Sequence, residues 1–238
     1  MYAQTAMKVV DHAAYPIPAM CKGMEREAAS RIVAISSLQT IDAGKAVFAE
    51  GDDADNVYEV VRGMLKLYKL LPDGRRQIMG FVSAGDLLGL SFSGVYLYTA
   101  EAVSDVTLCR YTRARFERLV DDVPGFARRL LAVRSDELRA AQDQMLLLGR
   151  KTAVEKIASF LLTLADRQAD AKDPNIVHVP MGRNDIADYL GLTTETVCRT
   201  LTKLKSSGVI KSISTASIKL VDRSKLEDSA AGEFQEEF

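Results

Sequence analysis

The sequence predicts an α+β protein with a β-rich first half and a helical second half, and three observations predict it. Eight glycines interrupt residues 44–94, and the segments between them are rich in β-branched and aromatic residues. From residue 112 the apolar residues recur at helical spacing as far as Leu148. Two short helical patterns and a hairpin pattern follow. We therefore expect an N-terminal jelly-roll (a cupin-like double-stranded β-helix), a long helix and a small helical domain.

The composition is that of a soluble globular protein. The 238 residues are 47% apolar and 26% charged, with a formal charge of −1, and this length suits two domains. Cys21, Cys109 and Cys198 are odd in number and far apart, which disfavours a disulfide framework and indicates a reducing cytoplasm. No apolar stretch approaches roughly 20 residues and no secretory signal is visible, so we expect no membrane span.

The β-roll domain is expected to cover residues 23–121, after an irregular extension at 1–22 in which Pro16 and Pro18 interrupt regular structure. Apolar residues at helical spacing predict a short helix over 23–38. Strands are predicted at 57–61, 65–70, 78–82 and 99–111. The turn at Pro72-Asp73-Gly74 joins the second and third strands into a hairpin. Residues 65–70 alternate apolar and polar side chains, which predicts one solvated face.

Residues 122–149 are predicted to form one long helix that carries a homodimer seam. Positions spaced alternately four and three apart are typical of a coiled coil, here with Arg134 as a charged interruption. The seam residues are Leu131, Leu138, Ala141, Met145 and Leu148. The second stripe on an adjacent face is Leu130, Val133, Ala140 and Leu147. If one stripe covers the β-roll, the other is available to a partner. The alternative is a single amphipathic helix that packs only on its own β-roll.

Residues 150–222 contain the pattern of a winged helix-turn-helix. Ala187 is small where two helices would cross, and Gly191 supplies the left-handed turn. Val197 lies where the second helix must pack an apolar side chain against the first. A second hairpin pattern follows over residues 209–221 and would form the wing. Either of two adjacent threonines, at positions 193 and 194, can cap the second helix.

Charge is distributed unevenly between the end of this domain and the C-terminus. Residues 179–221 contain six Lys and Arg against three acids, whereas residues 222–238 contain two bases against six acids. The near-neutral total therefore hides a basic segment and an acidic tail, which we place at residues 223–238. A solvated charged face would explain a local excess. However, the basic residues fall on the second helix and the wing, which favours DNA as the partner.

The β-roll, the long helix and the winged motif together resemble the CRP/FNR superfamily of bacterial transcription regulators. Glu195-Thr196-Val197-Cys198-Arg199 carries the resemblance, and residues 142–148 and 185–193 are similar to the FNR/FixK branch. The resemblance covers about residues 23–222. It implies a cyclic-nucleotide-binding-like sensor domain and a homodimer on a palindrome related to TTGAT-N4-ATCAA. It also implies activation through RNA polymerase, with the loop 72–77 as a candidate contact, at genes for low-oxygen respiration or nitrogen fixation.

The second helix is expected to read bases with Glu195 and Arg199, which lie four residues apart on one face. Arginine donates two hydrogen bonds to guanine and glutamate accepts from cytosine, each worth roughly 1–3 kcal/mol of discrimination. By resemblance, Thr194 contributes to half-site choice. Residues expected at or near phosphates are Arg183, Thr196, Cys198, Thr202, Lys203, Lys205 and Lys211. The alternative for any one of these lysines is a role in solubility alone.

We expect no cyclic nucleotide. Nucleotide-binding relatives resemble Gly-Glu-Leu followed by Arg-Ser or Arg-Thr, in which the glutamate holds the ribose and the arginine neutralises the phosphate. The corresponding residues 85–100 contain no glutamate after Gly89, and no arginine occurs between Arg76 and Arg110. The phosphate would therefore have no counter-charge.

We also expect no cofactor and no metal. Relatives that hold an iron–sulfur cluster use four cysteines, and Cys21 and Cys109 are too few to do so within one chain. Haem would need an axial ligand, for which neither His12 nor His178 is well placed.

Two interpretations of Cys198 stay open. It replaces a serine that touches backbone or phosphate, or it is a redox brake whose thiol pKa is lowered by Arg199 and the helix dipole. Oxidation to a sulfinic or sulfonic acid would then set an anion against DNA. The competing function class is a ligand-binding regulatory subunit whose C-terminal domain contacts protein. No arrangement of catalytic residues is found, so an enzyme is not expected.

Overall fold

The computed structural model describes residues 18–21, 23–91, 93–168 and 173–232. In this part of the chain a β-rich unit precedes a helical unit, which confirms the predicted α+β order. The division falls between Arg134 and Ser135, inside the long helix α3 (Phe126–Arg150). None of the described helices is both long and apolar enough to cross a membrane.

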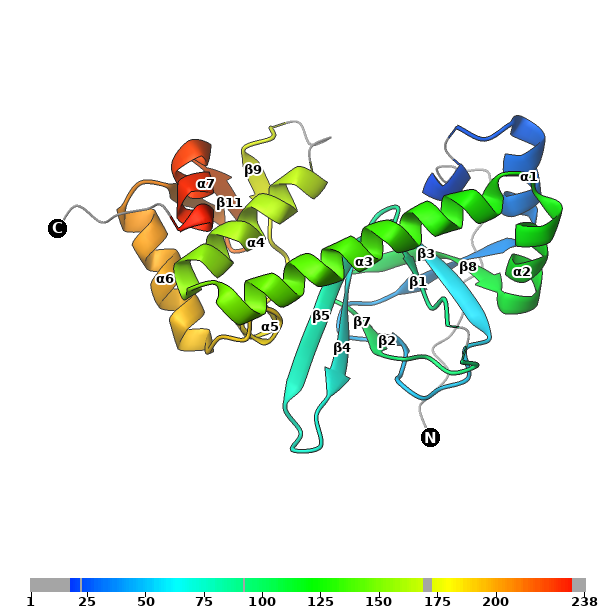
Figure 1. Cartoon of the computed structure of the whole chain (residues 1–238), viewed down its shortest axis with the longest axis horizontal. Coiled ribbons are helices and arrows are strands. Elements are labelled where there is room, and N and C mark those ends of the chain that lie inside the picture. The colour runs from blue at the N-terminus through cyan, green and yellow to red at the C-terminus, as the bar shows by residue number, and fades with distance from the viewer. Residues whose placement is uncertain (1–17, 22, 92, 169–172, 233–238) are drawn as a thin grey trace. The chain divides into compact units, whose positions relative to one another are not determined.

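Within the described residues, two four-stranded antiparallel sheets form the β-roll (Figure 1). The first contains, in spatial order, β1 (Ser36–Ile41), β8 (Val106–Thr112), β3 (Asn56–Arg62) and β6 (Leu87–Leu88). The second contains β2 (Ala46–Phe48), β7 (Thr99–Ala102), β4 (Met64–Leu70) and β5 (Arg76–Ser83). Leu65, Ala100 and Leu108 are fully buried between them. Burial of this apolar surface holds the two sheets together. The arrangement of two packed antiparallel sheets confirms the predicted jelly-roll.

The predicted hairpin is confirmed, but its solvated face is not. β4 and β5 pair around the turn, with Leu70 opposite Arg76. The alternation predicted an exposed Lys66, whereas this residue is 7% exposed and its Nζ lies 3.0 Å from Glu101 Oε1. The prediction is wrong because β7 pairs with β4 and brings Glu101 opposite Lys66. A buried charge is tolerated when such a partner neutralises it.

The helix predicted over residues 23–38 is wrong in its last part. Helix α1 (Arg26–Ala34) ends at Ala34, and β1 begins two residues later. Ile32 is fully buried, as helical spacing predicted, but Leu38 lies on β1 opposite Cys109. Pairing with β8 gives Leu38 a place in the core, and this long-range contact outweighs a weak local helix preference.

The single strand predicted over residues 99–111 is two strands. β7 belongs to the second sheet and β8 to the first. Between them the backbone N–H of Val103 donates to Met64 O at 2.8 Å, where the chain leaves one sheet for the other. Helix α2 (Arg113–Asp122) follows β8 directly. Residue alternation does not reveal which sheet a strand joins, so the break was not predicted.

A buried carboxylate ties the N-terminal segment to the β-roll. Residues 19–21 form a 3-10 turn, η2 (Ala19–Cys21), where an irregular chain was predicted; residues 1–17 and 22 of that extension lie outside the described residues. Glu59 on β3 is 1% exposed, and its Oε1 accepts the backbone N–H groups of Ala19 and Met20. Its Oε2 has no hydrogen-bond partner in the described part of the chain. Burial raises the pKa of Glu59 to about 7.

Glu59 is expected to make the fold less stable as the pH rises. The pKa of its carboxyl is about 7 in the folded chain against an ordinary value of 4.5, so the folded chain holds the proton more tightly. The free energy of unfolding should therefore fall between about pH 4.5 and about pH 7, by up to about 3 kcal/mol. Burial raises the pKa of Cys21 and Cys109 to about 11, and burial also raises the pKa of Tyr111, so these neighbours stay protonated. Arg129, the remaining charged neighbour, acts in the opposite direction to burial and lowers the pKa of Glu59.

Glu59→Gln tests this expectation. The amide keeps an oxygen that can accept the two backbone N–H groups and does not titrate. Denaturant unfolding at about pH 5 and about pH 7 should show a smaller loss of stability for the variant than for the wild type. Equal losses in the two proteins would show that Glu59 does not titrate in this range.

The long helix is confirmed as α3, but it begins at Phe126 and not at residue 122, because Asp122 ends α2 and a turn over residues 123–125 separates the two helices. The two apolar stripes of α3 have different surroundings. Leu130 and Val133 pack against the core of the β-roll. Leu131, Leu138 and Met145 are 72%, 60% and 64% exposed. The first two residues of one stripe therefore cover the β-roll, whereas Ala140 of that stripe is exposed, and the other stripe presents apolar side chains to solvent.

The second unit combines helices with a small sheet. Its helices are α4 (Ala153–Arg167), α5 (Arg183–Leu190), α6 (Thr194–Ser206) and α7 (Arg223–Ala231). Its three-stranded antiparallel sheet contains, in order, β10 (Ile210–Ser214), β11 (Ser217–Leu220) and β9 (Ile176–His178). α4 packs against α6, α7 and β9. β10 and β11 form the predicted wing.

The acidic tail predicted at residues 223–238 is wrong for its first nine residues, which form α7. Leu226 and Ala230 of α7 are buried, because the helix packs on α4. Asp222 caps the helix by accepting the backbone N–H of Lys225 at 3.0 Å. Residues 233–238 lie outside the described residues.

Candidate nucleic-acid interface

The helix-turn-helix predicted from three residues is confirmed. Gly191 follows α5 with φ of +61°, a left-handed conformation that glycine adopts at little cost. Ala187 and Val197 are 3% and 0% exposed where α5 and α6 pack together. A β-carbon at position 191 would also lie 3.4 Å from Leu148 Cδ2. The turn therefore fixes the start of α6 relative to α5.

Three threonines at the start of α6 make two separate sets of hydrogen bonds. Thr193 is the N-cap, because its Oγ1 accepts the backbone N–H of Thr196 at 3.1 Å. The hydroxyls of Thr193 and Thr196 lie 2.8 Å apart. Thr194 Oγ1 instead donates across the turn to Asn184 Oδ1 at 2.9 Å. Of the two predicted cap candidates, Thr193 is the one that caps.

Glu195 and Arg199 project from the first turns of α6 into solvent. Their side chains are 85% and 73% exposed, and Glu195 Oε1 lies 3.9 Å from Arg199 Nη1. An exposed ion pair of this kind contributes little to stability, so both groups are available to other partners. The guanidinium matches the O6 and N7 atoms of guanine, and the carboxylate matches the amino group of cytosine. The pair has the exposure and spacing that base reading requires.

The predicted phosphate contacts lie on α5, α6 and the wing. The exposed ones are Cys198, Thr202, Lys203, Lys205 and Lys211, and the half-buried ones are Arg183 and Thr196. Thr202 Oγ1 donates to Cys198 O at 2.9 Å within the helix. A phosphate oxygen only accepts hydrogen bonds, so Thr202 has no proton to offer it in this arrangement.

Lys219 is a basic residue of the wing that the sequence prediction missed. The hairpin register places it directly opposite Lys211, and both side chains are exposed. Like charges in directly opposite positions of a sheet are destabilising by up to about 1 kcal/mol, so this pair lowers the stability of the wing. An anion bound beside the two lysines would relieve their repulsion. A bulge at Ile213 shifts the register by one residue. Without the bulge, regular pairing outward from the turn would place Lys219 opposite Ser212.

The predicted dimer seam is mostly open to solvent. Ala141 is exposed, as are Leu138 and Met145 on the same face of α3. Leu148 differs, because it is half-buried and lies beside the turn at Gly191. The exposed part of the seam therefore ends before Leu148.

The three thiols lie in different environments. Cys198 is exposed on α6, whereas Cys21 and Cys109 are buried in the β-roll core. Among the described residues, no group of three His, Cys, Asp or Glu side chains could hold a metal ion. His178 is exposed on β9, and His12 lies outside the described residues.

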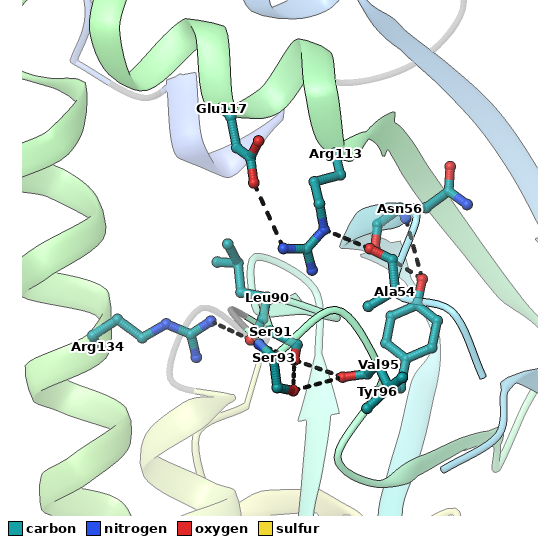
Figure 2. Close-up of polar contacts among 10 residues, drawn as sticks. All are labelled: Ala54, Asn56, Leu90, Ser91, Ser93, Val95, Tyr96, Arg113, Glu117 and Arg134. Atoms are coloured by element: carbon teal, nitrogen blue, oxygen red, sulfur yellow. Dashed lines mark hydrogen bonds and ion pairs between the residues drawn. The ribbon is translucent and has the colours of Figure 1, made fainter. Parts of the chain in front are cut away.

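The loop between β6 and β7, where relatives of the predicted family hold a nucleotide, is closed by its own hydrogen bonds (Figure 2). Ser91 Oγ and Ser93 Oγ both donate to Val95 O, at 2.6 and 3.3 Å. The Tyr96 hydroxyl donates to Asn56 O at 2.9 Å. The serine protons that could bind an anion are therefore used within the loop.

Two arginines beside this loop donate to backbone carbonyl groups (Figure 2). Arg113 Nε donates to Ala54 O at 2.6 Å, and its Nη1 lies 3.6 Å from Glu117 Oε1. Arg134, the charged interruption in the α3 seam, donates from Nη2 to Leu90 O at 3.2 Å. Both guanidinium groups thus hold parts of the β-roll in place.

We expect cyclic AMP not to bind this loop. The loop itself carries no arginine, the protons of Ser91 and Ser93 are used within it, and each of the two neighbouring arginines already donates to a backbone carbonyl group. Titration calorimetry of the full chain with cyclic AMP should show no binding heat beyond that of AMP. Binding of cyclic AMP tighter than millimolar would contradict the expectation.

Both parts of the chain match known domain families. Residues 155–229 match the Crp-like helix-turn-helix domain, and residues 38–122 match the cyclic nucleotide-binding domain. The chain is 46% identical over 190 residues to the nitrogen fixation regulation protein FixK of Bradyrhizobium diazoefficiens, covering 79% of this chain and 80% of that protein. It is 47% identical over 167 residues to the transcriptional activatory protein AadR of Rhodopseudomonas palustris, covering 70% of each.

A solved structure resembles most of this chain. The structure of FixK2 from Bradyrhizobium japonicum superposes with a TM-score of 0.77 at 38% identity. The match covers 82% of this chain and 96% of that one. It therefore includes both the β-roll and the helix-turn-helix.

Proposed function

Because this chain belongs to the CRP/FNR family of transcription regulators, we propose that it binds a palindrome related to TTGAT-N4-ATCAA as a homodimer and activates transcription there. One observation carries the proposal. The exposed pair Glu195 and Arg199 lies on a recognition helix whose start is fixed by Gly191. Such a pair reads a G·C base pair, and each proposed half-site contains one.

The exposed stripe of α3 supports the homodimer. Leu138 and Met145 are 60% and 64% exposed and lie on the same face as Ala141. A helix that packs only on its own β-roll has no need of a second apolar stripe. Burial of this stripe against a symmetry mate would set the two recognition helices about 34 Å apart, one turn of the duplex.

The relatives support the activator role and the regulated genes. One is named for the regulation of nitrogen fixation and another as a transcriptional activatory protein. We extend both to this chain. It would act in the cytoplasm, and its target genes would be those for low-oxygen respiration or nitrogen fixation. The turn from Pro72 to Gln77 would contact RNA polymerase. This segment contains the turn between β4 and β5 and the first two residues of β5, and it carries an exposed ion pair in which Arg75 Nε lies 2.7 Å from Asp73 Oδ2.

A gel shift with the full chain tests the function. A TTGAT-N4-ATCAA duplex should be retained at concentrations at which a duplex of the same composition in scrambled order is not. Equal retention of the two duplexes would refute sequence-specific binding. Failure to retain either would favour the competing function, a regulatory subunit whose C-terminal domain contacts protein.

Peroxide is expected to abolish operator binding through Cys198. This thiol is exposed on the recognition helix, whereas burial shields Cys21 and Cys109 and raises their pKa to about 11. Two equivalents of peroxide convert a thiol to a sulfinic acid, which ionises and sets a negative charge against phosphate. The sulfinate would also compete for the guanidinium of Arg199.

Cys198→Ser is the matched control for this prediction. Serine keeps the size and a hydroxyl, so the two proteins should bind alike before treatment. After peroxide the wild type should lose binding and the variant should keep it. Equal losses in a gel shift would leave Cys198 as an ordinary neighbour of the DNA.

A further inference from the structure

A hydrogen bond joins the two helices of the reading head at their exposed ends. Thr194, the first residue of α6, donates from Oγ1 to Oδ1 of Asn184, the second residue of α5, at 2.9 Å. Both residues are exposed. A hydrogen bond between exposed side chains adds little to stability, because water replaces it readily. The bond matters instead because it orients the hydroxyl of Thr194.

The bond decides which hydrogen bonds Thr194 can still make. A threonine hydroxyl has one proton to donate and two lone pairs that accept. Thr193 and Thr196 use their hydroxyls at the helix cap. Thr194 is not needed there, and its proton is directed to Asn184. What it presents to solvent is an oxygen that only accepts, and a methyl group.

These two groups together match one base pair in the major groove. An acceptor pairs with the amino group of adenine or cytosine, but not with the acceptor atoms of guanine or with O4 of thymine. The methyl group contacts the C5-methyl group of thymine. Only an A·T pair offers both an amino group and a methyl group.

We infer that Asn184 is a specificity-determining residue: it takes the proton of Thr194 and so makes Thr194 select an A·T pair in each half-site. The inference rests on the proposed DNA binding and names a positioning residue within it. Asn184 acts through Thr194 and need not touch the DNA. Removing its side chain frees the hydroxyl to donate as well as accept, which lets Thr194 tolerate guanine or thymine at the same place.

Binding of the full chain to a set of palindromic duplexes tests the inference. Each half-site position is changed in turn to all four base pairs, at constant salt. Thr194→Val identifies the position that Thr194 reads, because only the preference there should change. The wild type should prefer A·T at that position by about fivefold. Asn184→Ala should reduce that preference to less than twofold and leave the other positions unchanged.

Two further variants separate positioning from simple contact. Asn184→Asp keeps an oxygen that accepts from Thr194, so the A·T preference should survive although the added charge lowers affinity for every duplex equally. The double variant Asn184→Ala/Thr194→Val should show the base preferences of Thr194→Val alone. The salt dependence of binding should be the same for Asn184→Ala and the wild type, since no phosphate contact is lost.

Two outcomes would overturn the inference while leaving the proposed function intact. The first is an unchanged A·T preference in Asn184→Ala. The second is an equal loss of affinity on all duplexes with a shallower salt dependence, which would make Asn184 a phosphate contact. A wild type that prefers no palindrome over random DNA would instead refute the proposed function and the inference with it. Both side chains are exposed, so the thermal stability of each variant should stay close to that of the wild type.

Discussion

Arg199→Ala is expected to weaken binding to the TTGAT-N4-ATCAA duplex by about 1–3 kcal/mol and to relax the preference at one base pair. The guanidinium is 73% exposed and its ion-pair partner Glu195 is 85% exposed, so truncation should leave the fold unchanged. Glu195→Ala is expected to have an effect of similar size, because it removes the acceptor for the cytosine amino group and a partner that steadies Arg199.

Lys205→Ala provides the matched control. Lys205 is exposed on the same helix and is predicted to contact phosphate. Its loss should weaken binding by the same factor on the operator and on scrambled DNA, and should reduce the salt slope by about one. The loss in Arg199→Ala should instead be confined to the operator. An operator affinity of Arg199→Ala within twofold of the wild type would show that α6 has been wrongly assigned as the reading helix.

The reading head could be predicted because its signals are local. Gly191 must adopt a positive φ, Ala187 must be small and Val197 must be apolar, and these three requirements lie within eleven residues. Each is a property of a single residue at a fixed spacing. The exposure of Glu195 and Arg199 then follows from helical periodicity. No distant part of the chain is needed to reach this result.

The errors in the fold all arise where a distant segment decides the outcome. Leu38 looks helical until β8 pairs with it, and Lys66 looks solvated until β7 brings Glu101 opposite it. Residues 223–231 read as a charged tail because the surface of α4 that buries Leu226 is far away in sequence. Local patterns carry no information about such partners.

The site residues that were missed have the same explanation. Lys219 meets Lys211 because a bulge shifts the wing register, and Asn184 meets Thr194 because the turn folds α6 back against α5. The residues of the second pair are ten positions apart in the sequence. Base-reading side chains were therefore predictable from their positions on one helix, whereas the side chains that orient them or extend the basic surface needed the folded chain.

Ala141→Asp is expected to dissociate the homodimer at low micromolar concentration. Ala141 is exposed on α3 in the stripe that includes Leu138 and Met145, so a carboxylate there would face its symmetry mate inside the seam. Two like charges brought together out of water repel each other, and each loses hydration that nothing in the seam replaces. Because one half-site contributes only half of the contacts, a monomer should also lose most of its operator affinity.

Ala132→Asp is the control that assigns the effect to the seam. Ala132 is exposed on the same helix but lies outside both apolar stripes, so the same substitution there should leave sedimentation velocity profiles unchanged. The variants add equal charge to one helix and differ only in the face that receives it. A shift to the monomer for Ala141→Asp alone therefore locates the dimer contact on the exposed stripe. Profiles that stay dimeric for both variants would show that another surface holds the two chains together, and the apolar stripe of α3 would then need a different partner.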